Sequence, residues 1–373
     1  MSGRAERAGK VPIATNMQDV AARAGVSQRT VSNVVRGYVH VRPSTRERVQ
    51  RAIEELGYRP NPSARSLRAG RTGIIGLAVP EIAAPYFAEL ADHIQRAAAE
   101  RGLTLLVEQT GADRERELLA LQGHRGHVID GLILSPMAIS ADDLAGHEPG
   151  LPTVLLGERI SEGRLLDVAI DNVEAARVAT EHLLTTGRSR VAAIGADVTT
   201  NNVGPALRRL QGYRDALAGA ELATDPRLEV TTGGWDRRSG YAAVDRLLRS
   251  GVVVDALFCF NDMLALGAIR AISDRGLTVP GDLAVVGWDD IEEAQFSVPS
   301  LSSISPDKAG IAATAIDGLL AQLDQAPAGP LQVTCEHRLV VRESTAPRGT
   351  SSARVAPPTA ADKRIHDGSL TAH

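Results

Sequence analysis

Apolar residues recur at helical spacing in the stretch 17–36. They form two short stripes, which consist of Val20, Ala21 and Ala24 and of Val31, Val34 and Val35. Gly25 lies between the stripes, where a chain that leaves a helix sharply needs a positive φ. Ser27 follows, and its hydroxyl can cap a second helix by accepting a hydrogen bond from a backbone N–H two or three residues later. The pattern predicts two short helices joined by a tight turn.

A third helix is predicted shortly after this pair. Its apolar face consists of Val49, Ile53 and Leu56, which should close a small core over the first two helices. We expect Ser44 or Thr45 to cap this helix, with Glu47 in its first turn and Gly57 at its end.

From residue 73 the pattern changes to short aliphatic runs that alternate with amphipathic stretches. Strands are predicted at 74–79, 103–109, 131–135, 153–157, 191–196, 256–262 and 284–290. Helices are predicted at 86–101, 115–125, 173–186, 206–219, 238–250, 262–275 and 309–325. Alternating strands and helices indicate an α/β fold with parallel sheets covered on both faces. About 270 residues exceed one comfortable core, so we expect two sheets.

The second helix of the N-terminal pair has a polar and cationic surface, which is typical of the reading helix of a DNA-binding helix-turn-helix. The alternative is an ordinary helical hairpin in a core. The candidates for base contacts are Gln28, Arg29 and Asn33. Arg can bind guanine and Asn can bind adenine through two hydrogen bonds each. We expect Asn16, Thr30, Ser32 and the basic side chains mainly to hold phosphates.

The charge distribution supports the DNA interpretation. Residues 1–70 contain 13 Lys and Arg against 5 Asp and Glu, a net charge of +8, whereas the other 303 residues carry −12. A basic head on an acidic body is the electrostatic pattern of a protein that binds phosphates through its head. A merely solvated basic face would not be accompanied by a reading motif.

A second informative stretch is 61–71, which can form only one or two helical turns and is not stable alone in water. It has two interpretations, a flexible linker or a hinge that folds on DNA. In the second, Arg65 and its neighbouring arginines lie along the minor groove and Leu67 inserts between base pairs as an apolar wedge.

Two stretches closely resemble the LacI family of bacterial transcription regulators, DVAARAGVSQRTVSNVV and TRERVQRAIEELGYRPNPSARSLRAGRTGIIGL. The resemblance extends from about residue 16 to 347. It implies a body of two lobes in the periplasmic-binding-protein arrangement, which the chain connects by three crossings. We place the crossings near Asp171, Ser302 and Cys335. Asn33 stands where many relatives carry Arg, so their operator sequences cannot be transferred to this chain.

Ligands of open α/β sheets bind beyond the carboxyl ends of the strands, here in the cleft between lobes. Polar or aromatic residues at such positions are Arg209, Trp235, Asn261 and Asp289, which match effector-contacting positions of the family. For Asn172, Asp262 and Asp290 we prefer the role of helix N-cap. Tyr86 and Phe87 are candidates from the first lobe, although Phe87 equally fits a core position. Ala84 stands where many relatives have Asn, so one hydrogen bond to ligand is expected to be absent.

Other function classes find little support in the sequence. Cys259 and Cys335 lie in apolar runs and suit a core better than a disulfide scaffold. The sequence contains no P-loop, nucleophile elbow, dinucleotide fingerprint or histidine metal motif, so we expect no enzyme, no cofactor and no metal. No apolar run reaches the ~18 residues of a membrane span and no signal core follows the N-terminus, which indicates a cytoplasmic, nucleoid-associated protein.

The predicted domains are a disordered tail (1–14), a helix-turn-helix head (15–60), a hinge (61–71), a two-lobed ligand-binding body (72–346) and a second disordered tail (347–373). The tail lacks a leucine heptad, so we expect a homodimer. Its partners would be double-stranded DNA with a pseudo-palindromic operator and a sugar-like effector. The preferred function is a repressor of carbohydrate uptake or breakdown genes. Alternatives are a regulator that needs a purine-type corepressor, an activator, and a sugar-binding transport protein.

Overall fold

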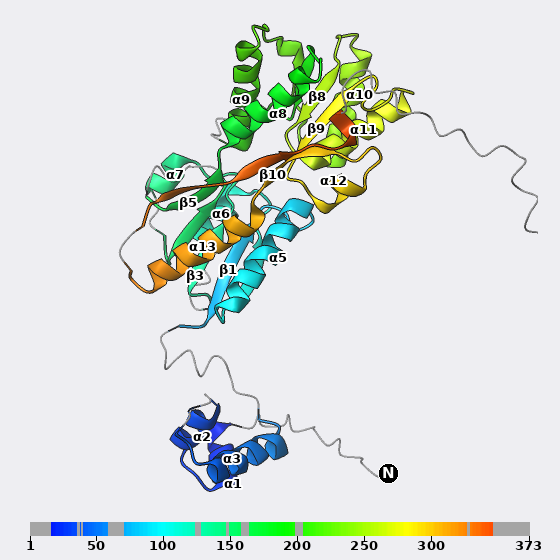
Figure 1. The fold of residues 1–373 in the computed structure, drawn as a ribbon. Coiled ribbons are helices and arrows are strands. Elements are labelled where there is room, and N and C mark those ends of the chain that lie inside the picture. Colours follow the sequence, from blue (N-terminus) through cyan, green and yellow to red (C-terminus); the bar gives the residue numbers. More distant parts are fainter. Residues whose placement is uncertain are drawn as a thin grey trace, which may run out of the picture. The chain divides into compact units, whose positions relative to one another are not determined.

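The structure is a computed structural model, and it describes residues 16–35, 38, 40–58, 71–123, 128–146, 149–157, 164–197, 204–326 and 329–345. The chain divides into two compact units, Met1–Ile74 and Ile75–His373. Figure 1 shows the helices α1, α2 and α3 in the first unit and a two-lobed body in the second. The two proposed disordered tails and the hinge at 61–70 lie outside the described residues. None of the described helices is long and apolar enough to cross a membrane.

The head consists of α1 (Met17–Ala24), α2 (Gln28–Val35) and α3 (Pro43–Leu56) packed around one core. The fully buried centre is formed by Val20, Val31 and Val49, one from each helix. Gly25 ends α1 with φ +64°, and the Ser27 hydroxyl accepts from the Thr30 N–H at 3.2 Å. These contacts confirm the predicted helix pair, its turn and its cap.

The predicted start of the third helix is wrong. α3 begins at Pro43, after Arg42, which makes no side-chain cap, and its first turn contains no acidic residue. Proline suits the first helical position because its φ is already helical and it has no N–H to leave unpaired. Ser44 and Thr45 therefore lie inside the first turn. The predicted end is right, since Gly57 closes α3 with φ +59°.

The body contains two six-stranded sheets, as the strand pattern predicted. Lobe 1 has the order β11-β5-β4-β3-β1-β2, and lobe 2 has the order β12-β10-β9-β8-β6-β7. The strands of lobe 1 are β1 (Ile74–Val79), β2 (Thr104–Gln109), β3 (Gly131–Leu134), β4 (Thr153–Leu156), β5 (Leu166–Ile170) and β11 (Gln332–Cys335). Those of lobe 2 are β6 (Val191–Ile194), β7 (Glu229–Val230), β8 (Ala256–Cys259), β9 (Ala284–Trp288), β10 (Ser302–Pro306) and β12 (His337–Val340). β12 pairs antiparallel with β10, whereas the central pairs of both sheets are parallel.

Helices pack against the sheets of both lobes. In lobe 1, α5 (Pro85–Glu100) packs beside α13 (Lys308–Leu323), which lies on β3, β4 and β5 (Figure 1). The shorter α6 (Arg114–Leu121) and α7 (Ala141–Gly146) follow β2 and β3. Lobe 2 carries α8 (Asn172–Thr185), α9 (Pro205–Gly219), α10 (Arg237–Arg249), α11 (Asp262–Asp274) and α12 (Glu292–Phe296).

Two helix pairs of lobe 2 approach closely at glycine. A Cβ on Gly212 of α9 would lie 2.0 Å from the carbonyl oxygen of Val173 on α8. A Cβ on Gly267 of α11 would lie 2.1 Å from the carbonyl oxygen of Arg237 on α10. Only glycine permits these distances, so both pairs are held at backbone contact.

The chain crosses between lobes three times. The crossings follow β5 at Asp171, β10 at Asp307, and β11 at Glu336. Two of them agree with the predicted places near Asp171 and Cys335. The third lies after the end of β10, whereas Ser302 is the first residue of that strand. β5, β7, β10, β11, β12, α7 and α12 were not predicted, since each is short or lacks a clear period.

Candidate functional site

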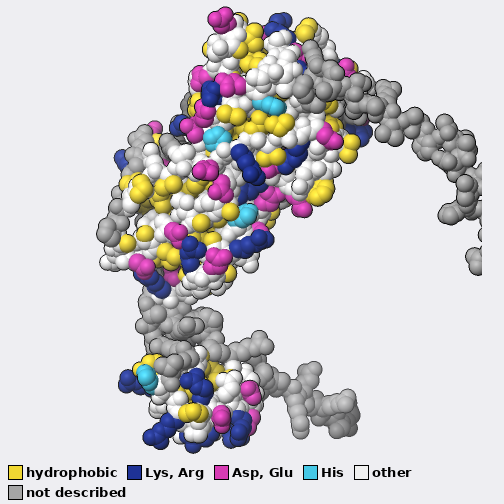
Figure 2. All heavy atoms as spheres, viewed as in Figure 1, with side chains coloured by type: hydrophobic (Ala, Val, Ile, Leu, Met, Phe, Trp, Pro, Cys, Tyr) yellow, Lys and Arg dark blue, Asp and Glu magenta, His cyan; other side chains and the backbone are white. Residues whose placement is uncertain are grey.

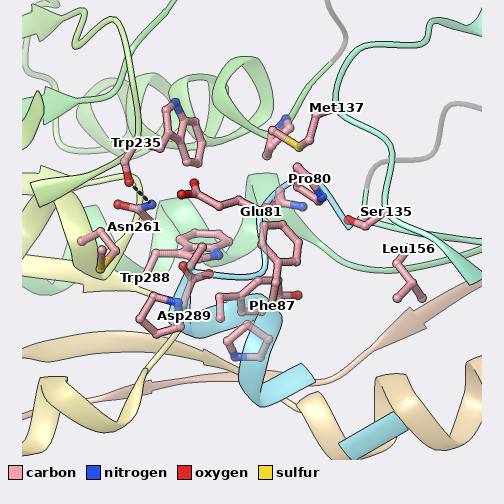
Figure 3. Close-up of a pocket in the computed structure, with 18 of the residues that line it drawn as sticks. Pro80, Glu81, Phe87, Ser135, Met137, Leu156, Trp235, Asn261, Trp288 and Asp289 are labelled. Carbon is pink, nitrogen blue, oxygen red and sulfur yellow. Dashed lines mark hydrogen bonds between the residues drawn. The ribbon is translucent and has the colours of Figure 1, made fainter. Parts of the chain in front are cut away.

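A cavity of about 430 Å³ opens between the two lobes at the carboxyl ends of their strands. Figure 3 shows its lining residues converging from β1 and α5 of lobe 1 and from β8 and β9 of lobe 2. All six predicted effector residues line it, namely Tyr86, Phe87, Arg209, Trp235, Asn261 and Asp289. The topology therefore brings together side chains that are up to about 200 positions apart in the sequence, as expected for open α/β sheets.

Arg209 on α9 is held on several sides. Its guanidinium lies over the Trp288 ring, 4.0 Å from the centroid, and 5.4 Å from that of Trp235. Nε donates to Asn172 Oδ1 at 3.0 Å, and Nη1 donates to the Phe260 carbonyl. An Arg held between an aromatic face and fixed acceptors needs little reorganisation to bind a ligand.

Asp289 follows β9 in an unusual backbone conformation. Its φ is +104°, and that of Asp290 is +47°. Two consecutive non-glycine residues with positive φ store strain, which is characteristic of functional sites. Burial raises the pKa of Asp289 to about 7, while the positive charges of Arg209 and Lys308 pull this pKa down. The carboxyl group thus titrates near neutral pH.

Aromatic side chains form the apolar walls. Burial, together with the nearby Asp289, raises the pKa of Tyr86 far above its ordinary value, so the phenol stays neutral. Its ring contacts that of Phe87 edge to face, 5.1 Å between centroids. Trp235 and Trp288 face the cavity from lobe 2, and they are the only two tryptophans of the chain. Planar apolar walls with a few directed polar groups suit a sugar ring.

Asn261 lines the cavity, but both ends of its amide are engaged. Its Oδ1 caps α11 by accepting from the Leu264 N–H at 2.8 Å. Its Nδ2 donates to the Trp235 carbonyl at 2.9 Å, the bond drawn in Figure 3. Asn261 therefore fixes the loop that carries Trp235.

The preferred N-cap roles of three neighbouring residues are wrong. The caps of α8 and α11 are Asp171 and Asn261, one residue earlier than predicted, and α12 follows Ile291 without a side-chain cap. The displaced residues have other partners. Asn172 accepts from Arg209, and Asp290 forms an ion pair with Arg342.

Asp262 is the third displaced residue, and it is fully buried. It accepts from Ser303 Oγ at 2.7 Å and from the Ile291 N–H at 2.9 Å. Burial and the neighbouring Asp289 raise its pKa well above the ordinary range. The carboxyl of Asp262 therefore stabilises the turn after β9 through its bond to the Ile291 N–H.

Lobe 1 contributes lining residues that the sequence analysis missed. Ala84 lines the cavity and is the N-cap of α5, without a side-chain cap hydrogen bond. The missed residues include Glu81, Ser135 and Met137 of lobe 1, and Asp236 and Trp288 of lobe 2 were missed as well. Glu81 is the second residue after β1 and Ser135 directly follows β3, so the strand-end rule used for lobe 2 would have found them. Trp288 lies in the predicted strand 284–290 and is buried, as expected for a core strand. Its ring also packs against the guanidinium of Arg209.

The carboxyl of Asp289 gives the body a pH-dependent stability. Because its pKa is about 7 in the folded protein and near 3.8 in the unfolded chain, the folded state binds the additional proton between these values. Stability should therefore fall as pH rises from about 4 to about 7, by at most about 1.4 kcal/mol per pH unit from this group. Urea unfolding at pH 5, 6, 7 and 8 should show a shallower decline in the Asp289→Asn variant. The same slope in both proteins would contradict this assignment, because the variant removes the Asp289 carboxyl and also its effect on the pKa of Asp262.

The DNA-reading candidates lie on the outer side of the head. Gln28 and Arg29 on α2 are exposed, whereas Thr30, Ser32 and Asn33 are half-buried. Thr30 Oγ1 is 2.9 Å from Ser27 Oγ, so its hydroxyl is partly engaged. Figure 2 shows dark blue Lys and Arg side chains gathered on the visible face of the head.

Asn16 and Tyr38 extend this surface. Asn16 caps α1, with Oδ1 accepting from the Gln18 and Asp19 N–H groups. Tyr38, half-exposed between α2 and α3, was not predicted as a contact. Its carbonyl accepts from Arg46 at 2.7 Å. Arg65 and Leu67 lie outside the described residues.

Comparison with known proteins identifies both parts of the chain. Residues 16–61 match the family model of bacterial regulatory proteins of the lacI family, and residues 180–345 match the periplasmic binding protein-like domain. The HTH-type transcriptional regulator AscG of Escherichia coli is 34% identical over 334 residues, 88% of this chain and 98% of that protein. The chain belongs to the LacI family. It is a DNA-binding transcriptional regulator, and its relatives are regulators and not enzymes.

Solved structures agree with this assignment. CelR of Thermobifida fusca is 35% identical over 341 residues, 88% of this chain and 97% of that protein. The structure of a CelR–cellobiose complex is similar with a TM-score of 0.64, at 34% identity over 88% of this chain and 99% of that one. The Lac repressor dimer bound to operator and an anti-inducer gives a TM-score of 0.77, at 27% identity over 90% of this chain and 100% of that one.

Proposed function

We propose that this LacI-family protein is a homodimeric repressor of carbohydrate uptake or breakdown genes, controlled by a sugar-like effector in the cleft between its lobes. The observation that carries the proposal is the cavity in which Arg209, Asp289 and Trp235 converge. A guanidinium and a carboxylate can donate to and accept from sugar hydroxyls, while an indole face packs on the ring. CelR, a relative that binds cellobiose in its solved complex, supports the choice of ligand class.

On DNA, α2 of each head would enter the major groove. Gln28, Arg29 and Asn33 would contact bases, while Asn16, Thr30 and Ser32 would hold phosphates. Arg65 and Leu67 would occupy the minor groove from the hinge. We therefore propose that the protein acts in the cytoplasm, on the nucleoid. The operator-bound Lac repressor dimer supports a pseudo-palindromic site with one half for each head.

Control requires that effector bind two states of the dimer with different affinity. The effector would contact both lobes and so would favour one relative orientation of the lobes. If that orientation disfavours folding of the two hinges on operator, the effector induces transcription. The opposite preference describes a corepressor, as in the purine-type alternative.

An exposed apolar corner of lobe 2 supports the homodimer. Phe296, at the end of α12, is 72% exposed, and Val298 nearby is 91% exposed. Large apolar side chains that gather on a surface mark an interaction site. A partner subunit would cover them.

A Phe296→Asp variant should shift the protein from dimer to monomer, because a charge would be buried in an apolar contact. We expect the dimer dissociation constant to rise at least about 100-fold, measured by sedimentation equilibrium. The matched control is Val253→Asp, which alters an equally exposed valine before β8 (70% exposed) and should leave the dimer intact. Dimers of normal stability in Phe296→Asp would remove this corner from the interface.

A thermal-shift screen of neutral sugars, sugar phosphates and purines tests the ligand class. A compound selective for the folded protein raises its melting temperature. Because both tryptophans line the cavity, a true ligand should also change the intrinsic tryptophan fluorescence. We expect a neutral sugar to do both. A purine that does both would instead establish the corepressor alternative, and a set of compounds with no effect would contradict the proposed site.

A further inference from the structure

A partly buried ion pair of lobe 1 lies just outside the cavity. Glu89 on α5 pairs with Lys308, the first residue of α13, and their side chains are 28% and 10% exposed. Both groups also reach lobe 2. Lys308 Nζ donates to the Asp290 carbonyl at 3.0 Å, and the Glu292 N–H donates to Glu89 Oε1 at 2.8 Å. One carboxylate and one ammonium from lobe 1 thus hold the segment 290–292 of lobe 2.

The Glu292 N–H lies at the start of α12, where a capping side chain normally accepts a hydrogen bond. α12 follows Ile291, and no side chain of its own cap residue accepts from its first N–H groups. Such groups need an external acceptor. Glu89, on α5 of the other lobe, supplies one.

The segment held in this way begins at the strained turn of the cavity. Asp289 and Asp290 both have positive φ, which persists only where the surroundings determine it. From lobe 2, Asp262 holds the Ile291 N–H and Arg342 holds the Asp290 carboxylate at 2.7 Å. Ser303 Oγ of lobe 2 also accepts from the Asp290 N–H at 3.1 Å. Lobe 1 adds the hydrogen bonds of Glu89 and Lys308.

We propose that Glu89 is a positioning residue, through which lobe 1 sets the placement of the 289–292 turn and of α12 without contacting the effector. The inference rests on the proposed function for the role of Asp289 in the cavity. It predicts that a change in the distance between the lobes alters the structure at two places at once. One is the carboxyl group of Asp289, and the other is the exposed corner at Phe296.

The charges of Glu89 and Lys308 also affect the pKa of Asp289. Lys308 lowers the pKa of Asp289 and Glu89 raises it, so the two charges of the pair act on the cavity carboxyl in opposite directions. The other charged group that acts strongly on Asp289 is Arg209, which also lowers its pKa. Burial has the largest effect and is common to all variants of the pair.

The test uses the full-length, effector-free protein and hydrogen–deuterium exchange. Glu89→Ala should speed exchange of the amides of 291–296 about ten-fold, because the bond from the Glu292 N–H to a charged acceptor is lost. The matched control is Asp92→Ala on the same helix, where Asp92 pairs only with exposed Arg96 and should not affect 291–296. Unchanged exchange of 291–296 in Glu89→Ala would overturn the proposal.

A second measurement excludes a general packing defect. The pH midpoint of tryptophan fluorescence, which reports the carboxyl beside Trp288, should fall in Glu89→Gln and rise in Lys308→Met. Shifts in the same direction, or no shift, would overturn the proposal even if exchange rises throughout the lobe. A negative sugar screen would change neither the exchange rates nor the pH midpoint. The positioning role of Glu89 and the proposed sugar ligand can therefore be refuted independently.

Discussion

An Arg209→Met variant is expected to bind operator DNA normally and to lose at least about 100-fold in effector affinity. Arg209 is 8% exposed, lines the cavity and is oriented by Trp288, Asn172 and the Phe260 carbonyl. Hydrogen bonds from a charged group contribute about 1.5–3 kcal/mol each, and its loss also leaves Asp289 without its main positive neighbour. Titration of tryptophan fluorescence with the sugar found in the screen measures the change.

The matched control is Arg214→Met on the same helix. Arg214 pairs with Glu229 and does not line the cavity, so effector affinity should stay within about two-fold. Thermal unfolding of both variants separates lost affinity from lost stability, since Arg209 also supports the core of lobe 2. Normal effector affinity in a folded Arg209→Met protein would show that the effector does not bind this guanidinium.

Arg29→Ala should have the largest effect on DNA binding. Each two-pronged contact of Arg with guanine contributes about 1–3 kcal/mol, and a symmetric dimer loses it in both half-sites. The expected loss of operator affinity is therefore about 30-fold to 10⁴-fold at fixed salt. Arg29 is exposed on α2, so its removal should not unfold the head. Binding-site selection followed by fluorescence anisotropy measures the loss and shows which base position loses its preference.

Arg23→Ala is the control for a general loss of charge. Arg23 is an exposed arginine on α1 that pairs with Glu55, so its removal should weaken binding slightly and leave the selected sequence unchanged. Selection with Asn33→Ala completes the experiment, because Asn33 should prefer adenine. If Arg29→Ala selects the same sequence with the same affinity, α2 does not read the operator as proposed.

The strand and helix periods predicted the architecture because they are local. The aliphatic strands and amphipathic helices of the body could be predicted without knowledge of contacts. The strand ends pointed to Asn261 and Asp289, which line one cavity. Helix starts were less predictable. Asn261 and Asp262 are both good cap residues, and only the point at which β8 ends decides which of them caps α11.

Contacts between distant segments could not be predicted from the sequence. Glu89 and Lys308 are 219 positions apart, and nothing near either residue distinguishes it from a solvated surface charge. β11 and β12 are too short to show a period, yet they join the two lobes. Such features arise from tertiary packing, which overrides local preference.

Operator release by a cleft ligand tests the central claim most directly. The effector-free dimer would be bound to its selected operator and titrated with the sugar that stabilises it, with Asp289→Asn as the variant that should respond weakly. The proposed mechanism predicts that the ligand lowers operator affinity at least about ten-fold, which corresponds to a coupling of about 1.4 kcal/mol. A ligand that occupies the cleft, quenches the tryptophans and leaves operator affinity unchanged would contradict it.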